Sequence, residues 1–270
     1  MQIDFLFLIP ITPKNLLNDQ RRALQSLCFN QLLELQSSYR VWLLGEADFF
    51  SDNFEQIELN ASSKEDKLYL AGQKLESMKV FPARYLVRLD DDDLINPVVF
   101  DELASEQFDI AYDSHHCFYD LSSGLTSSQK REWIPNTAIH RMEMALEKVD
   151  KVGGSELAIE KNYLMACDHS KAWKSFYRGK KIKQSDPSKP IYLRVLNNSS
   201  RTALGSASND SKNEYFRYLK TFGSWKSPFP LENELKNELL RIGKLGGRSL
   251  ENWNFPKMSL LQRIKRKIRG

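Results

Sequence analysis

The chain has 270 residues, of which 41% are hydrophobic and 11% aromatic, and its formal net charge is +4. This apolar content supports a sizeable core, which excludes a globally disordered chain. Three widely spaced cysteines exclude a disulfide framework and favour a reducing compartment. No apolar run reaches the roughly 20 residues that span a bilayer, and the apolar start lacks a basic leader and a cleavage site. We therefore expect a cytoplasmic protein.

The first 95 residues alternate between apolar runs and amphipathic segments. Buried strands are expected at 3–12, 40–48 and 83–93, and helices at 18–36 and 62–80. Asn18 is the expected N-cap of the first helix, and Ser62 or Ser63 that of the second. This β-α-β-α-β order predicts an α/β fold with a mostly parallel, Rossmann-like sheet flanked by helices.

The second half of the chain is less regular. We expect a helix from Pro97, a strand and hairpin over 108–126, a helix at 136–149, another from about Asp168, a strand at 189–198, a Ser/Asn/Gly-rich loop at 199–214, and helices at 213–225 and 231–246. These segments predict one domain at 1–205, in halves 1–100 and 101–205, and a helical region at 206–270.

Four consecutive aspartates, Asp90 to Asp93, follow the third predicted strand in "YLVRLDDDDLINP". Doubly wound sheets bind ligands at the carboxyl ends of their strands. Adjacent carboxylates repel by roughly 1 kcal/mol per pair at 4 Å even in water, so cations or donors must compensate. Asp90 and Asp92 would share one face of an extended chain and Asp91 and Asp93 the other, and each pair could hold a hard divalent cation. The alternative is an acidic N-terminus for the helix that follows.

Three segments, "FLIPIT", "VWLLGEAD" and "YLVRLDDDDLINP", together resemble the nucleotide-sugar-binding half of GT-A-fold glycosyltransferases, specifically the family-2-like bacterial group that includes rhamnosyltransferases. The family pattern Leu-Asp-x-Asp-Asp followed by Pro is matched by Leu89, Asp90, Asp92, Asp93 and Pro97. The resemblance covers residues 3–100 well and the remainder loosely. It implies a GT-A domain at 1–205, whose half at 1–100 binds the donor and whose half at 101–205 binds the acceptor.

The resemblance also implies a function. The chain would be a metal-dependent hexosyltransferase that moves a sugar from a nucleoside-diphosphate sugar to a glycan or lipid-linked acceptor, with inversion, in bacterial surface polysaccharide synthesis. Asp92 and Asp90 would hold Mn²⁺ or Mg²⁺ against the diphosphate. Donor contacts are implied at strand ends and the segments after them, by Pro10, Thr12, Glu46, Lys67, Arg88, Asp90, Asp91, Arg194 and Arg201.

The acceptor side offers weaker signals. Asp168 and His169 in "CDHSKAW" are the candidate catalytic base, although Asp168 could equally cap a helix. Trp133 is the candidate acceptor contact, or part of the core. Asn197 stands where related enzymes have a His near the metal or diphosphate.

The C-terminal segment 258–270, "MSLLQRIKRKIRG", combines an apolar stripe with five basic residues. This pattern predicts a basic amphipathic tail at 257–270 that binds an anionic membrane on the inner face of the plasma membrane, rather than a nucleic acid. A helix packed on the body, or a disordered tail, is the alternative.

Two other functions stay open. A nucleotidyltransferase also uses aspartates on Mg²⁺, but "IPITPKNLLNDQ" has no Gly-rich phosphate loop after the first strand. A non-enzymatic, basic peripheral membrane-binding protein would carry the aspartates as a structural Ca²⁺ site.

Overall fold

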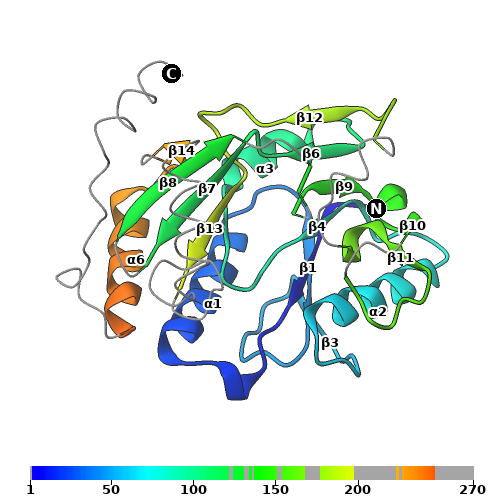
Figure 1. The fold of residues 1–270 in the computed structure, drawn as a ribbon, viewed down its shortest axis with the longest axis horizontal. Helices are drawn as coiled ribbons and strands as arrows, with labels where there is room; N and C mark the ends of the chain where they lie inside the picture. The colour runs from blue at the N-terminus through cyan, green and yellow to red at the C-terminus, as the bar shows by residue number, and fades with distance from the viewer. Residues whose placement is uncertain are drawn as a thin grey trace, which may run out of the picture.

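The computed structural model describes residues 2–121, 124–130, 134–135, 137–150, 154–167, 177–197, 223–224 and 227–246. Within these ranges the central sheet has seven strands in the order β12-β6-β9-β4-β1-β2-β3 (Figure 1). The pairs β1–β2, β1–β4, β2–β3 and β12–β6 are parallel, and β9 runs antiparallel to both of its neighbours. The predicted α/β class, with a mostly parallel sheet flanked by helices, is confirmed.

The first half follows the predicted alternation closely. Its elements are β1 (Ile3–Pro10), η1 (Lys14–Leu16), α1 (Asp19–Leu32), β2 (Tyr39–Leu44), β3 (Phe54–Ile57), α2 (Lys64–Glu76) and β4 (Ala83–Arg88). The side chain of Asn18 accepts from the backbone N–H of Arg21, and that of Ser63 from Asp66, so both helices begin at side-chain caps. The short edge strand β3 was not predicted, because its sequence, FEQI, lacks a clear apolar run.

The second half builds further sheets beside the first. Its elements are β5 (Leu94–Ile95), α3 (Pro97–Ala104), β6 (Ile110–Tyr112), β7 (His115–Asp120), β8 (Leu125–Lys130), β9 (Ile139–Arg141), α4 (Met142–Ala145), β10 (Lys148–Asp150), β11 (Lys161–Tyr163), η2 (Leu164–Ala166), β12 (Ile182–Gln184), β13 (Tyr192–Leu196), β14 (Gly223–Ser224) and α6 (Asn233–Leu245). Among the described residues, β14-β8-β7-β13-β5 form a second sheet, and β10 pairs with β11. The predicted hairpin, the strand at 189–198, the helix start at Pro97 and the helix at 231–246 are confirmed.

The helix predicted at 136–149 is wrong for most of its length. Residues 139–141 form β9, which fills the place between β4 and β6, and only 142–145 are helical. The backbone groups of β4 and β6 would otherwise face each other across an unfilled gap without hydrogen-bond partners. That demand comes from strands far away in sequence, so local apolar spacing does not reveal it.

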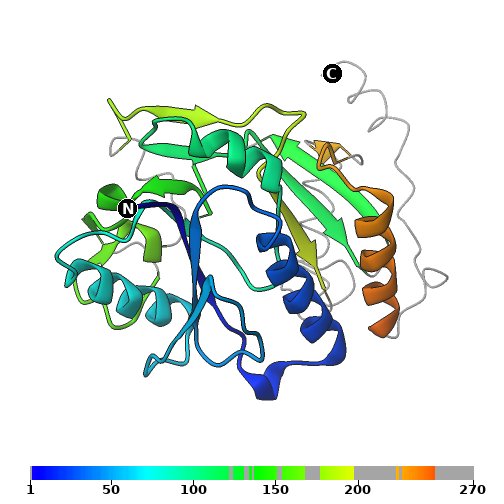
Figure 2. The ribbon, with the colours of Figure 1, turned by 180° about the vertical axis from the view of Figure 1, so that it is seen from behind.

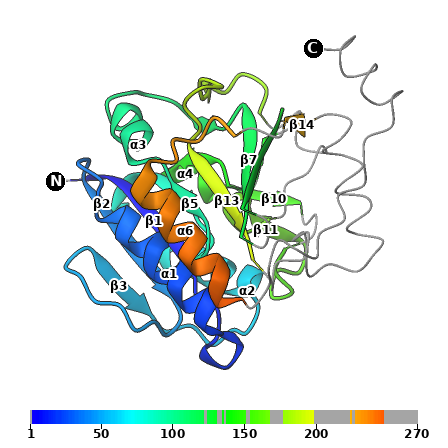
Figure 3. The same ribbon diagram turned by 90° about the vertical axis from the view of Figure 1, so that its left-hand side faces the viewer.

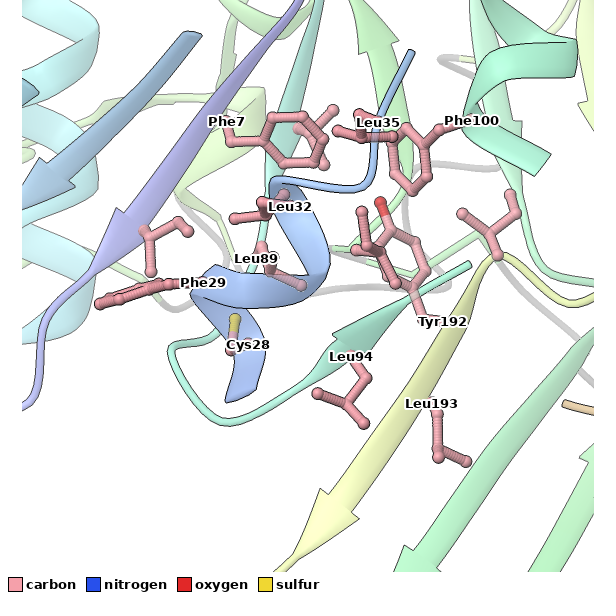
Figure 4. Close-up of a cluster of buried hydrophobic side chains, with 14 of the residues drawn as sticks. Phe7, Cys28, Phe29, Leu32, Leu35, Leu89, Leu94, Phe100, Tyr192 and Leu193 are labelled. Carbon is pink, nitrogen blue, oxygen red and sulfur yellow. The ribbon is translucent and has the colours of Figure 1, made fainter. Parts of the chain in front are cut away.

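The core lies on both faces of β1, whose side chains alternate across the sheet. Phe5, Phe7 and Ile9 pack against α1, α3 and the second sheet, whereas Leu6 and Leu8 pack against α2. The helices α1 and α2 accordingly lie on opposite sides of β1 in Figures 1 and 2. Figure 4 shows the larger cluster, where Phe100 of α3 contacts both Phe7 of β1 and Tyr192 of β13.

All three cysteines are buried and free of disulfide bonds. Within the described ranges, none of the helices is long and apolar enough to cross a membrane.

Candidate functional site

The aspartate run lies at the point where the strand order reverses. The chain builds β1, β2 and β3 outward in one direction, and then returns to place β4 on the other side of β1. Thr12 follows β1, and Asp91 follows β4. The backbone N–H of Thr12 donates to Oδ2 of Asp91 at 2.8 Å, and the Thr12 hydroxyl donates to Oδ1 at 3.1 Å. This is the place in an open α/β sheet where ligands bind.

The four aspartates form a turn rather than the end of a strand. β4 ends at Arg88, and the N–H of Asp93 donates to the carbonyl of Asp90 at 3.2 Å. The expectation that Asp90 and Asp92 share one face of an extended chain is therefore wrong. Because the backbone turns, each carboxylate points toward a different set of partners.

Asp91 connects the turn to β1 and α1. Only 1% of it is exposed, and besides Thr12 it accepts from Nε2 of Gln25 at 2.9 Å and pairs with the guanidinium of Arg21. Its two oxygens thus bond four protein donors. The predicted contact between Asp91 and a donor molecule remains a prediction, while its structural role is evident from these bonds.

Asp92 shares the same guanidinium. One terminal nitrogen of Arg21 donates an N–H to Asp92, and the other donates an N–H to Asp91. Nδ2 of Asn197, just after β13, also donates to Asp92 at 2.6 Å. Burial raises the pKa of Asp92 to about 6, although the positive charge of Arg21 opposes this shift. Asn197, singled out in the sequence for its position, therefore reaches the aspartate turn as a hydrogen-bond donor.

Of the four side chains, Asp90 is the one that remains partly exposed, at 22%, and it pairs with Lys64 at the start of α2. Burial opposes ionisation, but Lys64, Arg88 and Arg194 together hold the pKa of Asp90 well below its ordinary value. Asp90 is therefore a carboxylate that stays ionised and reaches the surface of the site.

Asp93 is buried and accepts from the backbone N–H of Val195 in β13 at 3.1 Å. Burial raises the pKa of Asp93 well above its ordinary value, and the neighbouring charge of Asp92 adds to this shift. This bond attaches the turn to the second sheet. The turn therefore touches β1, α1, α2 and β13 at once.

Two of the cations predicted to bind the donor, Lys67 and Arg88, are buried. Nζ of Lys67 is buried and donates to the carbonyl of Ile11 at 2.8 Å, and burial lowers the pKa of Lys67. Arg88 is also buried, and its Nη1 donates to the carbonyl of Cys167 at 3.1 Å and that of Met165 at 3.4 Å. Both side chains hold the backbone that borders the site, which explains their burial without a ligand.

The remaining predicted residues divide into three groups. Pro10 ends β1 and pairs in register with Leu44 of β2, so it borders the switch point. Glu46 is 73% exposed and pairs with Lys14 at 2.6 Å. Outside the described residues lie Trp133, Asp168, His169, Arg201 and the tail at 257–270.

Sequence reasoning missed Arg21, which is the cation at the centre of the turn. A signal was present, because Arg21 lies in the first turn of the helix that follows β1. The first turn of such a helix starts at the same sheet edge as the end of the strand before it. A cation there could have been matched to the aspartates that β4 brings to the same edge.

The described residues contain no group of three or more His, Cys, Asp or Glu side chains arranged to hold a metal ion. A Mg²⁺-type site does not require one, because such ions are often held by one or two carboxylates together with substrate phosphates. Asp90 fits that role best, since it is ionised and partly exposed. Asp92 fits it once its bonds to Arg21 and Asn197 are rearranged.

No protein-family model and no curated protein matches the chain. Similar solved structures include S. aureus TarS 1–349, with 12% identity, a TM-score of 0.41, and coverage of 97% of this chain and 77% of that one. The same TarS fragment in complex with UDP gives 11% identity and a TM-score of 0.43, with equal coverage. A glycosyltransferase involved in glycosylation of the major capsid of PBCV-1 gives 10% identity and a TM-score of 0.35, and covers 71% of this chain and 93% of that one. Because likeness at this level carries no argument about activity, we base the function on the geometry of the site.

Proposed function

We propose that this chain is a metal-dependent glycosyltransferase that transfers a sugar from a nucleoside-diphosphate sugar to a glycan or lipid-linked acceptor. One observation carries the proposal: an aspartate turn lies at the carboxyl ends of β1 and β4, beside Thr12, where the strand order reverses. Ligands of open α/β sheets bind at this point. The turn offers an ionised, partly exposed carboxylate there, flanked by cations.

The donor diphosphate would lie over Asp90, with Lys64 and Arg194 beside it. Both cations lower the pKa of Asp90, so their positive charge reaches the place where the phosphates would bind. Asp90 and Asp92 would hold Mn²⁺ or Mg²⁺, which as a Lewis acid would neutralise charge on the departing nucleoside diphosphate. Thr12 would border the nucleoside at the end of β1, as Pro10 would.

The catalytic base is proposed to be Asp168, with His169 beside it, for a direct displacement that inverts the anomeric centre. Support comes from Cys167, whose carbonyl accepts from Arg88 at the end of β4. Asp168 is the next residue in the sequence after Cys167. Trp133 is proposed as an acceptor contact.

A lipid-linked acceptor would suit a chain that binds the inner face of the plasma membrane through its basic tail at 257–270, in bacterial surface polysaccharide synthesis. This part of the proposal is supported by the sequence of the tail.

A thermal-shift panel with UDP, GDP and dTDP, each with and without Mn²⁺, tests the proposal. A nucleotide at about 100 times its Kd stabilises the folded state by about 2.7 kcal/mol, which for a chain of this size raises Tm by roughly 5–10 °C. We expect such a shift with at least one nucleotide in the presence of Mn²⁺, and its loss in Asp90→Asn.

Asp52→Asn is the matched control. Asp52 is an exposed aspartate just before β3, at the amino edge of the sheet and therefore opposite the proposed site. This variant should keep the full nucleotide shift. No shift with any nucleotide and metal, or equal shifts in the two variants, would overturn the proposal.

A further inference from the structure

A groove of about 790 Å³ lies away from the aspartate turn, between the C-terminal half of α1, the start of α3 and the N-terminal half of α6. Figure 3 shows α1 and α6 side by side, and Gln20 of α1 donates to the carbonyl of Ile242 at 3.3 Å. None of the four aspartates of the turn lines the groove. Its apolar lining residues are Leu27, Ile95, Val98, Phe229 and Leu235.

The rim of the groove is strongly acidic. Of the described residues that line it, five carry carboxylates and one carries a cation; the carboxylates are Glu34, Asp101, Glu232, Glu234 and Glu238. The cation, Arg241, already pairs with Glu238 at 2.8 Å. Asp101 accepts from backbone N–H groups at Gln36 and Ser37. Burial, and then repulsion from Glu232 and Glu234, raise the pKa of Glu34. Among the described residues, no cation forms an ion pair with Glu34, Glu232 or Glu234.

A second feature indicates that the groove binds a hydrogen-bond donor. Gln31 of α1 lines it with only 8% of the residue exposed, and its buried Oε1 has no hydrogen-bond partner within the described part of the chain. Buried acceptors in folded proteins are almost always paired, so an unpaired one calls for an explanation. An occupant that brings N–H groups and positive charge would satisfy Gln31 and the rim together.

We propose that, when the chain is not bound to a membrane, the groove binds the chain's own C-terminal segment, residues 258–270. Its sequence, MSLLQRIKRKIRG, has five basic residues and no acidic one. Leu260, Leu261, Ile264 and Ile268 recur at helical spacing and match the apolar floor, while the basic residues match the rim. An apolar stripe flanked by cations is complementary to an apolar groove flanked by carboxylates. This complementarity favours the C-terminal segment as the occupant of the groove.

The chain is long enough for this arrangement. Residues 247–257 connect the end of α6 to the segment, and 11 residues reach up to about 36–40 Å when extended. α6 has 13 residues and is therefore about 20 Å long. A chain that leaves the C-terminal end of α6 can thus return to the groove beside its N-terminal half. The inference is independent of the proposed enzymatic activity.

Trypsin cleavage of the full-length protein tests the docking, because the segment's five basic residues are trypsin sites. The test variant is Glu34→Gln/Glu232→Gln/Glu234→Gln, which removes the uncompensated carboxylates while keeping side-chain shape. The matched control is Glu55→Gln/Glu143→Gln/Glu160→Gln, three exposed glutamates that do not line the groove. Cleavage within 258–270 is followed by mass spectrometry.

We expect cleavage within the segment to be at least about tenfold slower in the parent and the control than in the test variant. Raising the salt to 1 M, where the Debye length falls to about 3 Å, should remove most of that protection. Equal cleavage rates in all three proteins would overturn the proposal. Protection that grows with protein concentration would assign the groove to a second copy's segment. Protection that appears only when phosphatidylserine vesicles are added would leave the segment with no site except a membrane. Either result would also overturn the proposal.

Discussion

Asp91→Asn should be the most destabilising single substitution in the aspartate turn. The carboxylate of Asp91 accepts from the N–H and hydroxyl of Thr12 and from Gln25, and it pairs with Arg21. An asparagine keeps the shape but replaces one acceptor oxygen by an NH₂ group. In either orientation of the amide, that group faces donors that already point at the position. One side of the site would then lose its acceptor, and Arg21 would lose half of its compensating charge.

The magnitude follows from burial. Removing one partner of a buried ion pair costs about 3–5 kcal/mol, because the other charge is left uncompensated. Asp90 and its partner Lys64 are 22% and 34% exposed, so solvent can replace their interaction. A pair of this kind contributes only about 0–1 kcal/mol. Arg88, the buried cation near Asp90, still has Glu65 as a partner at 3.8 Å when Asp90 is replaced. Asp91→Asn should therefore cost roughly 3 kcal/mol more than Asp90→Asn, a difference of about 6–12 °C in Tm for a chain of this size.

Urea unfolding of the parent, Asp90→Asn, Asp91→Asn and the control Asp52→Asn measures this difference as a change in midpoint at constant slope. We expect Asp90→Asn and Asp52→Asn to unfold near the parent midpoint and Asp91→Asn far below it. The reasoning is refuted if Asp91→Asn stays within about 1 kcal/mol of Asp52→Asn, or if Asp90→Asn is equally destabilised. Because Asp90→Asn should remain folded, its loss of nucleotide binding would report function alone.

Three other predictions concern single residues. His140 of β9 is buried, which lowers its pKa to about 4. The unfolded chain binds a proton at this residue below about pH 6.5, so the free energy of unfolding should fall by up to about 3 kcal/mol as the pH drops from 6.5 through 4. His140→Leu should remove that part of the pH dependence of urea unfolding. Gly243→Ala should lower Tm despite the better helix propensity of alanine, because the added Cβ would lie 2.6 Å from the carbonyl oxygen of Leu121; a raised Tm would contradict this close packing. Arg21→Lys should destabilise by about 1–3 kcal/mol although the charge is kept, because lysine cannot bridge two carboxylates in one plane; unchanged stability would refute the bridge to Asp92.

Features that depend on neighbouring residues were readable from the sequence. The continuous apolar run of β1 predicted a strand buried on both faces. Asn18 and Pro97 marked helix starts, because caps form within a few residues. The position of the aspartates at the carboxyl edge of the sheet followed from the strand–helix alternation. All of these inferences use local backbone preference or burial pattern.

The tertiary structure alone decided the geometry of the site. The aspartates form a turn, and Arg21, 70 residues away from Asp91, is held between two of them. Both facts depend on how α1 packs against the turn and β5. The insertion of β9 between β4 and β6 likewise depends on backbone groups of distant strands that need partners. Charge pairing and strand pairing act between residues that are close in space, and sequence separation says little about either.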